Sequence, residues 1–162
     1  MGKALIVVDM QKQFYTEKSK EMMDKAVETI NKAVGLFRSK HQRVIWIQHE
    51  NKKTNLYAGQ RDFEIIDSLL PGQNEKIIIK TRGNGFLGTE LGDYLNKNAL
   101  TELYFCGYAA EACVNKTYNG GKDLGYSVHK LRNGIASGSK FNSRVFEMIG
   151  DYSTIDEVFQ EQ

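Results

Sequence analysis

The chain has 162 residues, the length of one ordinary domain and enough to bury a sizeable core. Hydrophobic residues make up 41% of it and charged residues 26%, a composition typical of a soluble globular protein. The net charge of +2 is too small to indicate a nucleic-acid or membrane-surface partner. Since the apolar run near the N-terminus is too short for a signal peptide or a membrane span, we expect a cytoplasmic protein.

Short apolar runs alternate with stretches of helical periodicity along the chain. We expect strands over 4–8, 43–48, 76–79, 102–106 and 126–131, with a short one near 152–155. We expect helices over 19–39, 89–96, 113–124 and 139–149, with a helical turn within 62–70. This alternation predicts one α/β domain over residues 1–162, a three-layer Rossmann-like fold. Its central parallel sheet has about six strands, with helices on both faces.

Polar side chains follow several of these strands. Asp9 comes directly after the first strand, Lys80 after the third, and Cys113 in the passage from the fourth strand to a helix. Open α/β sheets bind ligands at the carboxyl ends of their strands, so these three residues should converge. Other polar residues expected at the same edge are His49, Asn133 and Ser137.

An acid, an amine and a thiol at one edge suit nucleophilic catalysis. A helix N-terminus and the cation of Lys80 are expected to lower the pKa of Cys113, because both favour the thiolate. Asp9 could accept the thiol proton and return it to a leaving amine. The backbone N–H groups of Ala112 and Cys113 are candidates for an oxyanion hole. This set of groups favours acyl transfer from an amide, through a thioester, to water.

Three segments carry a family resemblance, and they read ALIVVDMQKQF, KTRGNGF and CGYAAEACVNKT. Together they resemble the motifs of the isochorismatase-like cysteine hydrolases, a superfamily that includes the nicotinamidases. The resemblance spans nearly the whole chain, with the segments in the family's order. It implies that Asp9, Lys80 and Cys113 are the catalytic triad. It also implies a cis peptide bond between Tyr108 and Ala109, which in the family helps to shape the oxyanion hole.

The resemblance also places aromatic residues in a substrate pocket. Phe14 matches the aromatic that follows the first motif, and Phe86 matches the last residue of the second. Phe63 lies roughly where the family has a tryptophan that stacks on planar substrates. We add Tyr108 because of its place beside the expected cis bond. Aromatic residues after strands are often packing residues, and that alternative stays open for all four.

Departures from the family motifs keep a second hypothesis open. The chain has Gln13, Asn84, Gly85 and Ala110 where the family usually has Asp, Ser, Ala and Thr. The chain could therefore be a binding or assembly module that retains the fold with little or no catalysis. The isochorismatase branch, which cleaves a vinyl ether and can dispense with the cysteine, ranks lower because Cys113 is present.

We expect no metal and no cofactor. Metal-dependent relatives carry a D-x-H motif and a further His, whereas the second strand here ends with one histidine, His49, in a position that is more often structural. The two cysteines, Cys106 and Cys113, show neither CxxC nor Cys/His spacing, and both should be free thiols. The run GNGFLG has the wrong spacing for a dinucleotide-binding loop and follows the wrong strand.

The leading hypothesis is a hydrolase that acts on a non-peptide C–N bond of a small amide, carbamoyl or ureido compound. The sequence does not identify the physiological substrate. The resemblance further implies a homo-oligomer, a dimer or a tetramer. The apolar and aromatic residues of 114–118 and of the following loop are expected to contribute to its interface.

Overall fold

The computed structural model describes residues 2–160, so residues 1, 161 and 162 of the expected domain lie outside the described part. Six strands form one sheet in the order β3-β2-β1-β4-β5-β6, and every pairing is parallel. The expected α/β fold with a parallel sheet is therefore confirmed. The strands are β1 (Gly2–Val8), β2 (Arg43–His49), β3 (Lys76–Lys80), β4 (Leu100–Tyr108), β5 (Ser127–Ala136) and β6 (Tyr152–Ser153).

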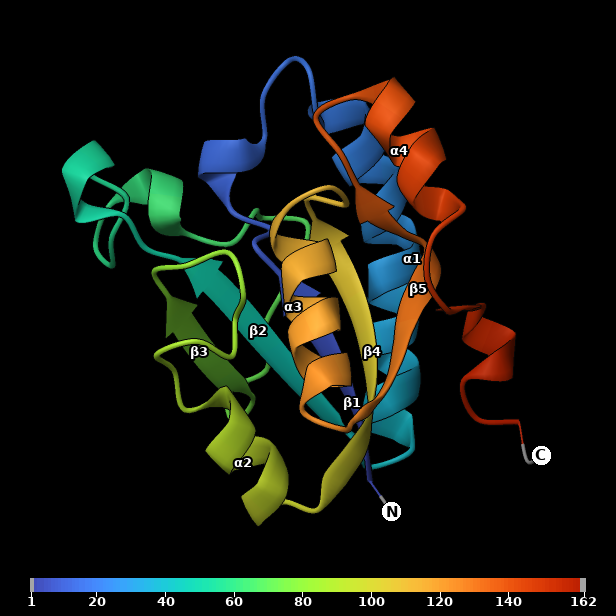
Figure 1. The fold of residues 1–162 in the computed structure, drawn as a ribbon. Coiled ribbons are helices and arrows are strands. Elements are labelled where there is room, and N and C mark those ends of the chain that lie inside the picture. Colours follow the sequence, from blue (N-terminus) through green and yellow to red (C-terminus); the bar gives the residue numbers. More distant parts are fainter. Residues whose placement is uncertain (1, 161–162) are drawn as a thin grey trace.

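Helices cover both faces of the sheet (Figure 1). The long helix α1 (Lys20–Ser39) lies on one face, and α2 (Leu91–Lys97) and α3 (Cys113–Asp123) lie on the other. The short helix α4 (Lys140–Glu147) runs beside α1. No helix within residues 2–160 combines the length and the apolar character needed to cross a membrane.

The hydrophobic core has two layers because β1 is buried on both faces. Leu5 and Val7 point toward α1, where Trp46 and Phe37 fill the space. Residues at the even positions of β1 point the other way, into a cluster with α2 and α3. A strand buried on both faces has no polar face, which explains its continuous apolar run.

Helix α3 belongs to this second layer. Val114 is fully buried and Tyr118 is 3% exposed, because both pack against the sheet. The core of the same chain thus already covers these two side chains, and the contribution of residues 114–118 to a subunit interface stays a prediction.

Strands β4 and β5 are longer than their sequence predicts. The pairing between them shifts register from Phe105–Lys130 to Gly107–Ile135, which leaves extra residues on β5. Asn133 lies in this irregular part with a φ of 65°, so it belongs to β5 rather than following it. A bulge breaks the apolar alternation by which strands are recognised, and this hid the second half of β5.

The segment between β2 and β3 has less helix than expected. A helical turn was expected within 62–70, but one 3-10 turn covers Arg61–Phe63 and another covers Lys52–Thr54. Just after the turn at Arg61–Phe63, Ile65 forms an antiparallel bridge with Gln11. The segment thus runs back along the sheet edge where β1 ends.

The strand order reverses beside β1, which lies between β2 and β4. The first half of the chain builds the sheet outward through β2 and β3, and the second half builds it through β4, β5 and β6. The arrowheads of β2, β3 and β4 point to one edge, the carboxyl edge (Figure 1). A crevice at such a reversal is where open α/β sheets bind ligands.

Candidate active site

Three predicted side chains meet at the carboxyl edge. Lys80 Nζ lies 3.0 Å from Asp9 Oδ2 and 3.2 Å from Cys113 Sγ. Asp9 is 1% exposed and Lys80 is fully buried, whereas Cys113 is partly exposed. A buried ion pair thus lies beside a cysteine that is partly exposed.

The end of β1 places Asp9 through an unusual backbone. Asp9 has a φ of 51°, and its N–H donates to the carbonyl of Ile47 at 2.9 Å. The neighbouring strand comes very close at this point, because Gly107 pairs with Val8. A Cβ at Gly107 would lie 2.1 Å from the Val8 carbonyl oxygen, and the φ of Gly107 is 113°. Glycine is required there by both space and conformation.

Lys80 is the last residue of β3, and His49 is the last residue of β2. Each strand is thus one residue longer at this end than expected, and each residue belongs to its strand instead of following it. The two strands pair so that His49 lies beside Lys80. Lys80 Nζ is 3.0 Å from His49 Nδ1, in addition to its contacts with Asp9 and Cys113. An ammonium group has three donors, and each of them has an acceptor within reach here.

Burial dominates the electrostatics of Asp9. It raises the pKa of this carboxyl above its ordinary value, and the positive charge of Lys80 opposes that rise. Asp9 Oδ1 has no hydrogen-bond partner within residues 2–160. A carboxylate with a raised pKa and a free oxygen is well suited to accept a proton.

The expected lowering of the Cys113 pKa is wrong. Burial raises the pKa of this thiol to about 11, the negative charge of Asp9 adds to the rise, and Lys80 opposes it. The start of a helix does not compensate for removal from water. Cys113 is therefore a thiol at neutral pH, and it needs a base at the moment of attack.

The backbone around Cys113 turns sharply before α3 begins. The peptide bond between Tyr108 and Ala109 is cis. The Ala112 N–H donates to the Ala109 carbonyl at 3.0 Å, and the Val114 N–H donates to the same oxygen at 3.2 Å. Within residues 2–160 the Cys113 N–H makes no backbone hydrogen bond outside the helix. Of the two expected oxyanion donors, the Cys113 N–H is thus the free one.

The predicted pocket aromatics divide into two groups. Phe14 and Tyr108 stack with ring centroids 5.3 Å apart, and charges on Glu111 and Cys113 help burial to raise the pKa of Tyr108. These two rings lie near the thiol. Phe63 is 6% exposed, in the segment that crosses the same edge.

Phe86 is not brought to the triad. Its ring stacks on Tyr126 with centroids 5.8 Å apart, and it contacts the site of Gly121 near the end of α3. The phenylalanine of the second motif therefore packs the loop onto the helix, as a partly buried member of the core beside α2 and α3.

Two of the departures from the family motifs also serve packing. A Cβ at Gly120 would lie 2.5 Å from the Asn84 side-chain amide, so this asparagine rests on a glycine of α3. The Gly85 N–H donates to Thr117 Oγ1 at 3.0 Å. Of the others, Gln13 is exposed and Ala110 is 6% exposed.

One site residue was missed. Gln11 is fully buried, and its Nε2 donates to the carbonyls of His49 at 3.0 Å and Phe63 at 2.9 Å. Its Oε1 accepts from the His49 N–H at 2.7 Å. The sequence gives one indication of this role: Gln11 is a polar residue two positions after Asp9, at the point where the first strand passes into a loop.

One group of side chains within residues 2–160 has the composition of a metal site. Donor atoms of Asp9, His49 and Cys113 lie within 4.8 Å of one another, and all three residue types bind zinc. Lys80 Nζ, however, lies 3.0 to 3.2 Å from an atom of each of them. The ammonium takes the position that a metal ion would need, so these residues do not fit a metal.

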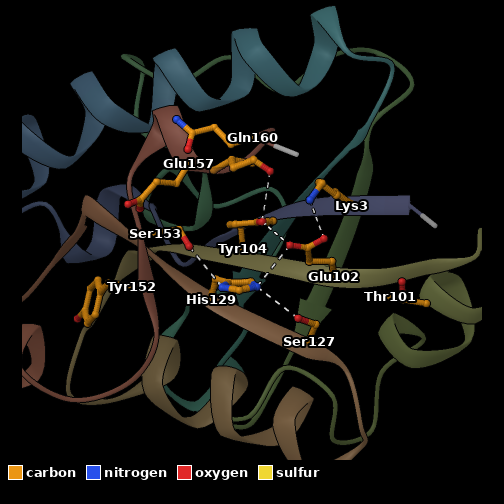
Figure 2. Close-up of a pocket in the computed structure, with 11 residues that line it drawn as sticks. Lys3, Thr101, Glu102, Tyr104, Ser127, His129, Tyr152, Ser153, Glu157 and Gln160 are labelled. Atoms are coloured by element: carbon orange, nitrogen blue, oxygen red, sulfur yellow. Dashed lines mark hydrogen bonds and ion pairs between the residues drawn. The ribbon is translucent and has the colours of Figure 1, made fainter. Parts of the chain in front are cut away.

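A cavity of about 740 Å³ lies away from the triad. Residues at the beginnings of β1, β4 and β5 line it, so it belongs to the amino edge of the sheet (Figure 2). Its lining includes Lys3, Glu102, Tyr104 and His129.

Comparison with known proteins places these features in a family. The family model described as the isochorismatase domain matches residues 3–148. The chain belongs to the isochorismatase family. This confirms the resemblance carried by the three motifs, and the meeting of Asp9, Lys80 and Cys113 is consistent with the triad that the resemblance implies.

Relatives and solved structures agree with this assignment. The isochorismatase-family protein YrdC of Bacillus subtilis is 34% identical over 83% of this chain and 74% of its own length. The ureidoacrylate amidohydrolase RutB of Klebsiella pneumoniae is 26% identical over 76% of this chain and 68% of its own. The crystal structure of N-carbamoylsarcosine amidase from Thermoplasma acidophilum superimposes with a TM-score of 0.81 at 22% identity, covering 99% of this chain and all of that one.

Proposed function

We propose that this isochorismatase-family hydrolase cleaves a non-peptide C–N bond of a small amide, carbamoyl or ureido compound. The observation that carries the proposal is the buried Asp9–Lys80 pair behind the partly exposed thiol of Cys113. RutB, which is named as a ureidoacrylate amidohydrolase, supports the choice of bond.

In the first step the sulfur of Cys113 attacks the carbonyl carbon. The thiol proton moves to Asp9, a C–S bond forms, and the oxygen becomes negative. The free N–H of Cys113 is the first proposed donor to this oxygen. The N–H of Ala112, the second proposed donor, would have to leave its hydrogen bond to the Ala109 carbonyl. The C–N bond then breaks as protonated Asp9 gives the proton to the leaving nitrogen, which leaves a thioester.

In the second step water attacks the thioester carbon. Asp9, again a carboxylate, takes a proton from the water and passes it to the departing sulfur. The acid product leaves, and the thiol is restored. Lys80 stays charged throughout, so that the ionised state of Asp9 has a partner at 3.0 Å when the carboxylate forms.

We propose that the stacked rings of Phe14 and Tyr108, together with Phe63, line the substrate site and favour a planar or partly apolar substrate. We further propose a cytoplasmic location, in which both thiols stay reduced, and a dimer or tetramer. Neither Cys106 nor Cys113 forms a disulfide within the described residues.

The alternative is a binding or assembly module without turnover. Two of the four departures that motivate it, Asn84 and Gly85, pack the loop against α3 and do not alter the triad. The alternative therefore rests mainly on Ala110, where the family usually has a hydroxyl.

The decisive experiment is an ammonia-release assay with a panel of small amides and ureides, nicotinamide among them. Cys113→Ala should abolish turnover of any substrate found, and its far-UV circular dichroism should match that of the wild type. Cys106→Ala is the matched control, because this thiol is fully buried and faces the Ile6 carbonyl. Turnover that survives in Cys113→Ala would refute the proposal.

A further inference from the structure

His49 is the group at the site that the family triad leaves without a role. It ends β2, its ring is half-buried, and its Nδ1 lies 3.0 Å from Lys80 Nζ. Its backbone is held from both sides, because Gln11 accepts from its N–H and donates to its carbonyl. A side chain that is fixed so closely against a catalytic ammonium can act on it.

We propose that His49 is a positioning residue for the reaction of Cys113: its neutral imidazole accepts a hydrogen bond from Lys80 and fixes the direction of the other two ammonium protons. This inference rests on the proposed function. With one proton directed to Nδ1, a second is donated to Cys113 Sγ at 3.2 Å, and the third is left for Asp9 Oδ2, the ion-pair partner at 3.0 Å. Without this acceptor one ammonium proton has no partner, and the directions of the other two are less firmly fixed.

The contact defines the protonation state of the ring. An ammonium only donates, so Nδ1 must carry a lone pair and the proton must be on Nε2. Burial lowers the pKa of His49, the charge of Lys80 lowers it further, and Asp9 opposes them. The titratable groups that face His49 are Lys80 on β3, Asp9 at the end of β1 and Cys113 at the start of α3.

Protonation of His49 has a predictable consequence. The imidazolium has no acceptor, and it places a second positive charge next to Lys80. Positioning is therefore present above the lowered pKa of His49 and is lost as the pH falls through it. The acid limb of kcat should contain this titration in addition to that of Asp9.

Two variants separate positioning from packing. Asn Oδ1 can replace Nδ1 as an acceptor and does not titrate, whereas leucine fills similar space without an acceptor. We expect His49→Leu to lower kcat roughly 10- to 100-fold with little change in KM, the effect of losing one hydrogen bond to a charged group. We expect His49→Asn to keep most of the wild-type kcat and only the acid limb due to Asp9. His129→Asn, at the opposite edge, is the control.

A spectroscopic measurement makes the result independent of any substrate. Long-range ¹H–¹⁵N correlation spectra at pH 7.5 should show His49 with the proton on Nε2, in the wild type and in Cys113→Ala. In Lys80→Met the two tautomers should mix. A proton on Nδ1 in the wild type would overturn the inference even if the proposed function holds. So would an unchanged kcat in His49→Leu, or equal losses in His49→Asn and His49→Leu. Loss of turnover in Cys113→Ala tests the function separately.

Discussion

The two edges of the sheet hold opposite arrangements of charge. At the carboxyl edge a cation, Lys80, lies among acceptors on Asp9, His49 and Cys113. At the amino edge an anion, Glu102, lies among donors. Lys3 Nζ is 2.6 Å from Glu102 Oε2, His129 Nε2 is 3.4 Å from Oε1, and the Tyr104 hydroxyl donates to Oε1 (Figure 2).

Burial separates the two clusters. Lys80 is fully buried, whereas the side chain of Glu102 is 30% exposed. Burial at the carboxyl edge raises the pKa of both Asp9 and Cys113, so it favours the protonated form of each. At the amino edge burial alone would raise the pKa of Glu102, but hydrogen bonds from Lys3 and Tyr104 lower it. The protonated forms of Asp9 and Cys113 are thus favoured at the carboxyl edge, whereas the charged form of Glu102 is favoured at the amino edge.

The amino edge also anchors the C-terminal segment. His129 stacks on Tyr104 with centroids 4.8 Å apart, and its Nδ1 lies 3.3 Å from Ser153 Oγ. The Tyr104 hydroxyl is 3.4 Å from the Val158 carbonyl. These contacts join β4, β5 and the last residues of the described chain, which indicates a structural role for this edge.

The largest effect is expected from Lys80→Met. This variant leaves the buried carboxyl of Asp9 without its partner, so turnover should vanish and the free energy of unfolding should fall by about 3–5 kcal/mol. Urea denaturation measures the loss. In the double variant Lys80→Met/Asp9→Asn most of the stability should return but no activity. A double variant as unstable as the single one would contradict the account of this pair.

Asp9→Asn should separate the role of Asp9 as a base from its effect on the pKa of Cys113. Turnover should fall by about 10²- to 10⁴-fold because the base is lost. The pKa of Cys113 should fall at the same time, because the charge of Asp9 no longer raises it. Alkylation by iodoacetamide at pH 8 should therefore be faster than in the wild type. Slower alkylation, in a variant that remains folded, would show that Asp9 activates the resting thiol.

A smaller change is expected from Glu102→Gln at the amino edge. The free energy of unfolding should fall by about 1–2 kcal/mol at neutral pH, with kcat unchanged. Since the pKa of Glu102 is lowered in the folded state, its contribution is present above the ordinary carboxyl pKa and disappears as the pH falls through the lowered value. The difference between variant and wild type should therefore shrink on acidification. A change in kcat would mean that the two edges are coupled.

The smallest effect is expected from Gly120→Ala. This variant tests whether the loop that packs on α3 affects catalysis at the carboxyl edge. The new Cβ would meet the Asn84 side chain, whose Oδ1 accepts from the Phe86 N–H. Displacing this loop should lower stability by about 1 kcal/mol and should alter KM more than kcat. Thermal melting and steady-state kinetics check this. The double variant Gly120→Ala/Asn84→Ala should regain the wild-type stability and KM, because the clash is removed. A large fall in kcat would mean that the loop also positions Lys80.

The meeting of Asp9, Lys80 and Cys113 could be predicted from the sequence because strand ends are easy to locate. Asp9 and Lys80 each stand where a buried apolar run stops, and parallel strands bring such residues together. The pKa of Cys113 was not predictable, since it depends on how much water the fold removes around the thiol. The contact between His49 and Lys80 depends on the register of β2 and β3, which no local pattern encodes. Phe86 was misplaced because a motif gives a position along the chain and not a direction.

The amide of Gln11 has a consequence for altering the specificity of the protein. It reaches the segment between β2 and β3 through the carbonyl of Phe63, and every amino acid supplies a carbonyl. The hydrogen bond between Gln11 and this segment therefore depends on the path of the main chain and not on the side chains of the segment. We expect that residues 52–62 can be exchanged for those of a relative with the catalytic groups left in place, as long as the carbonyl of residue 63 keeps its position.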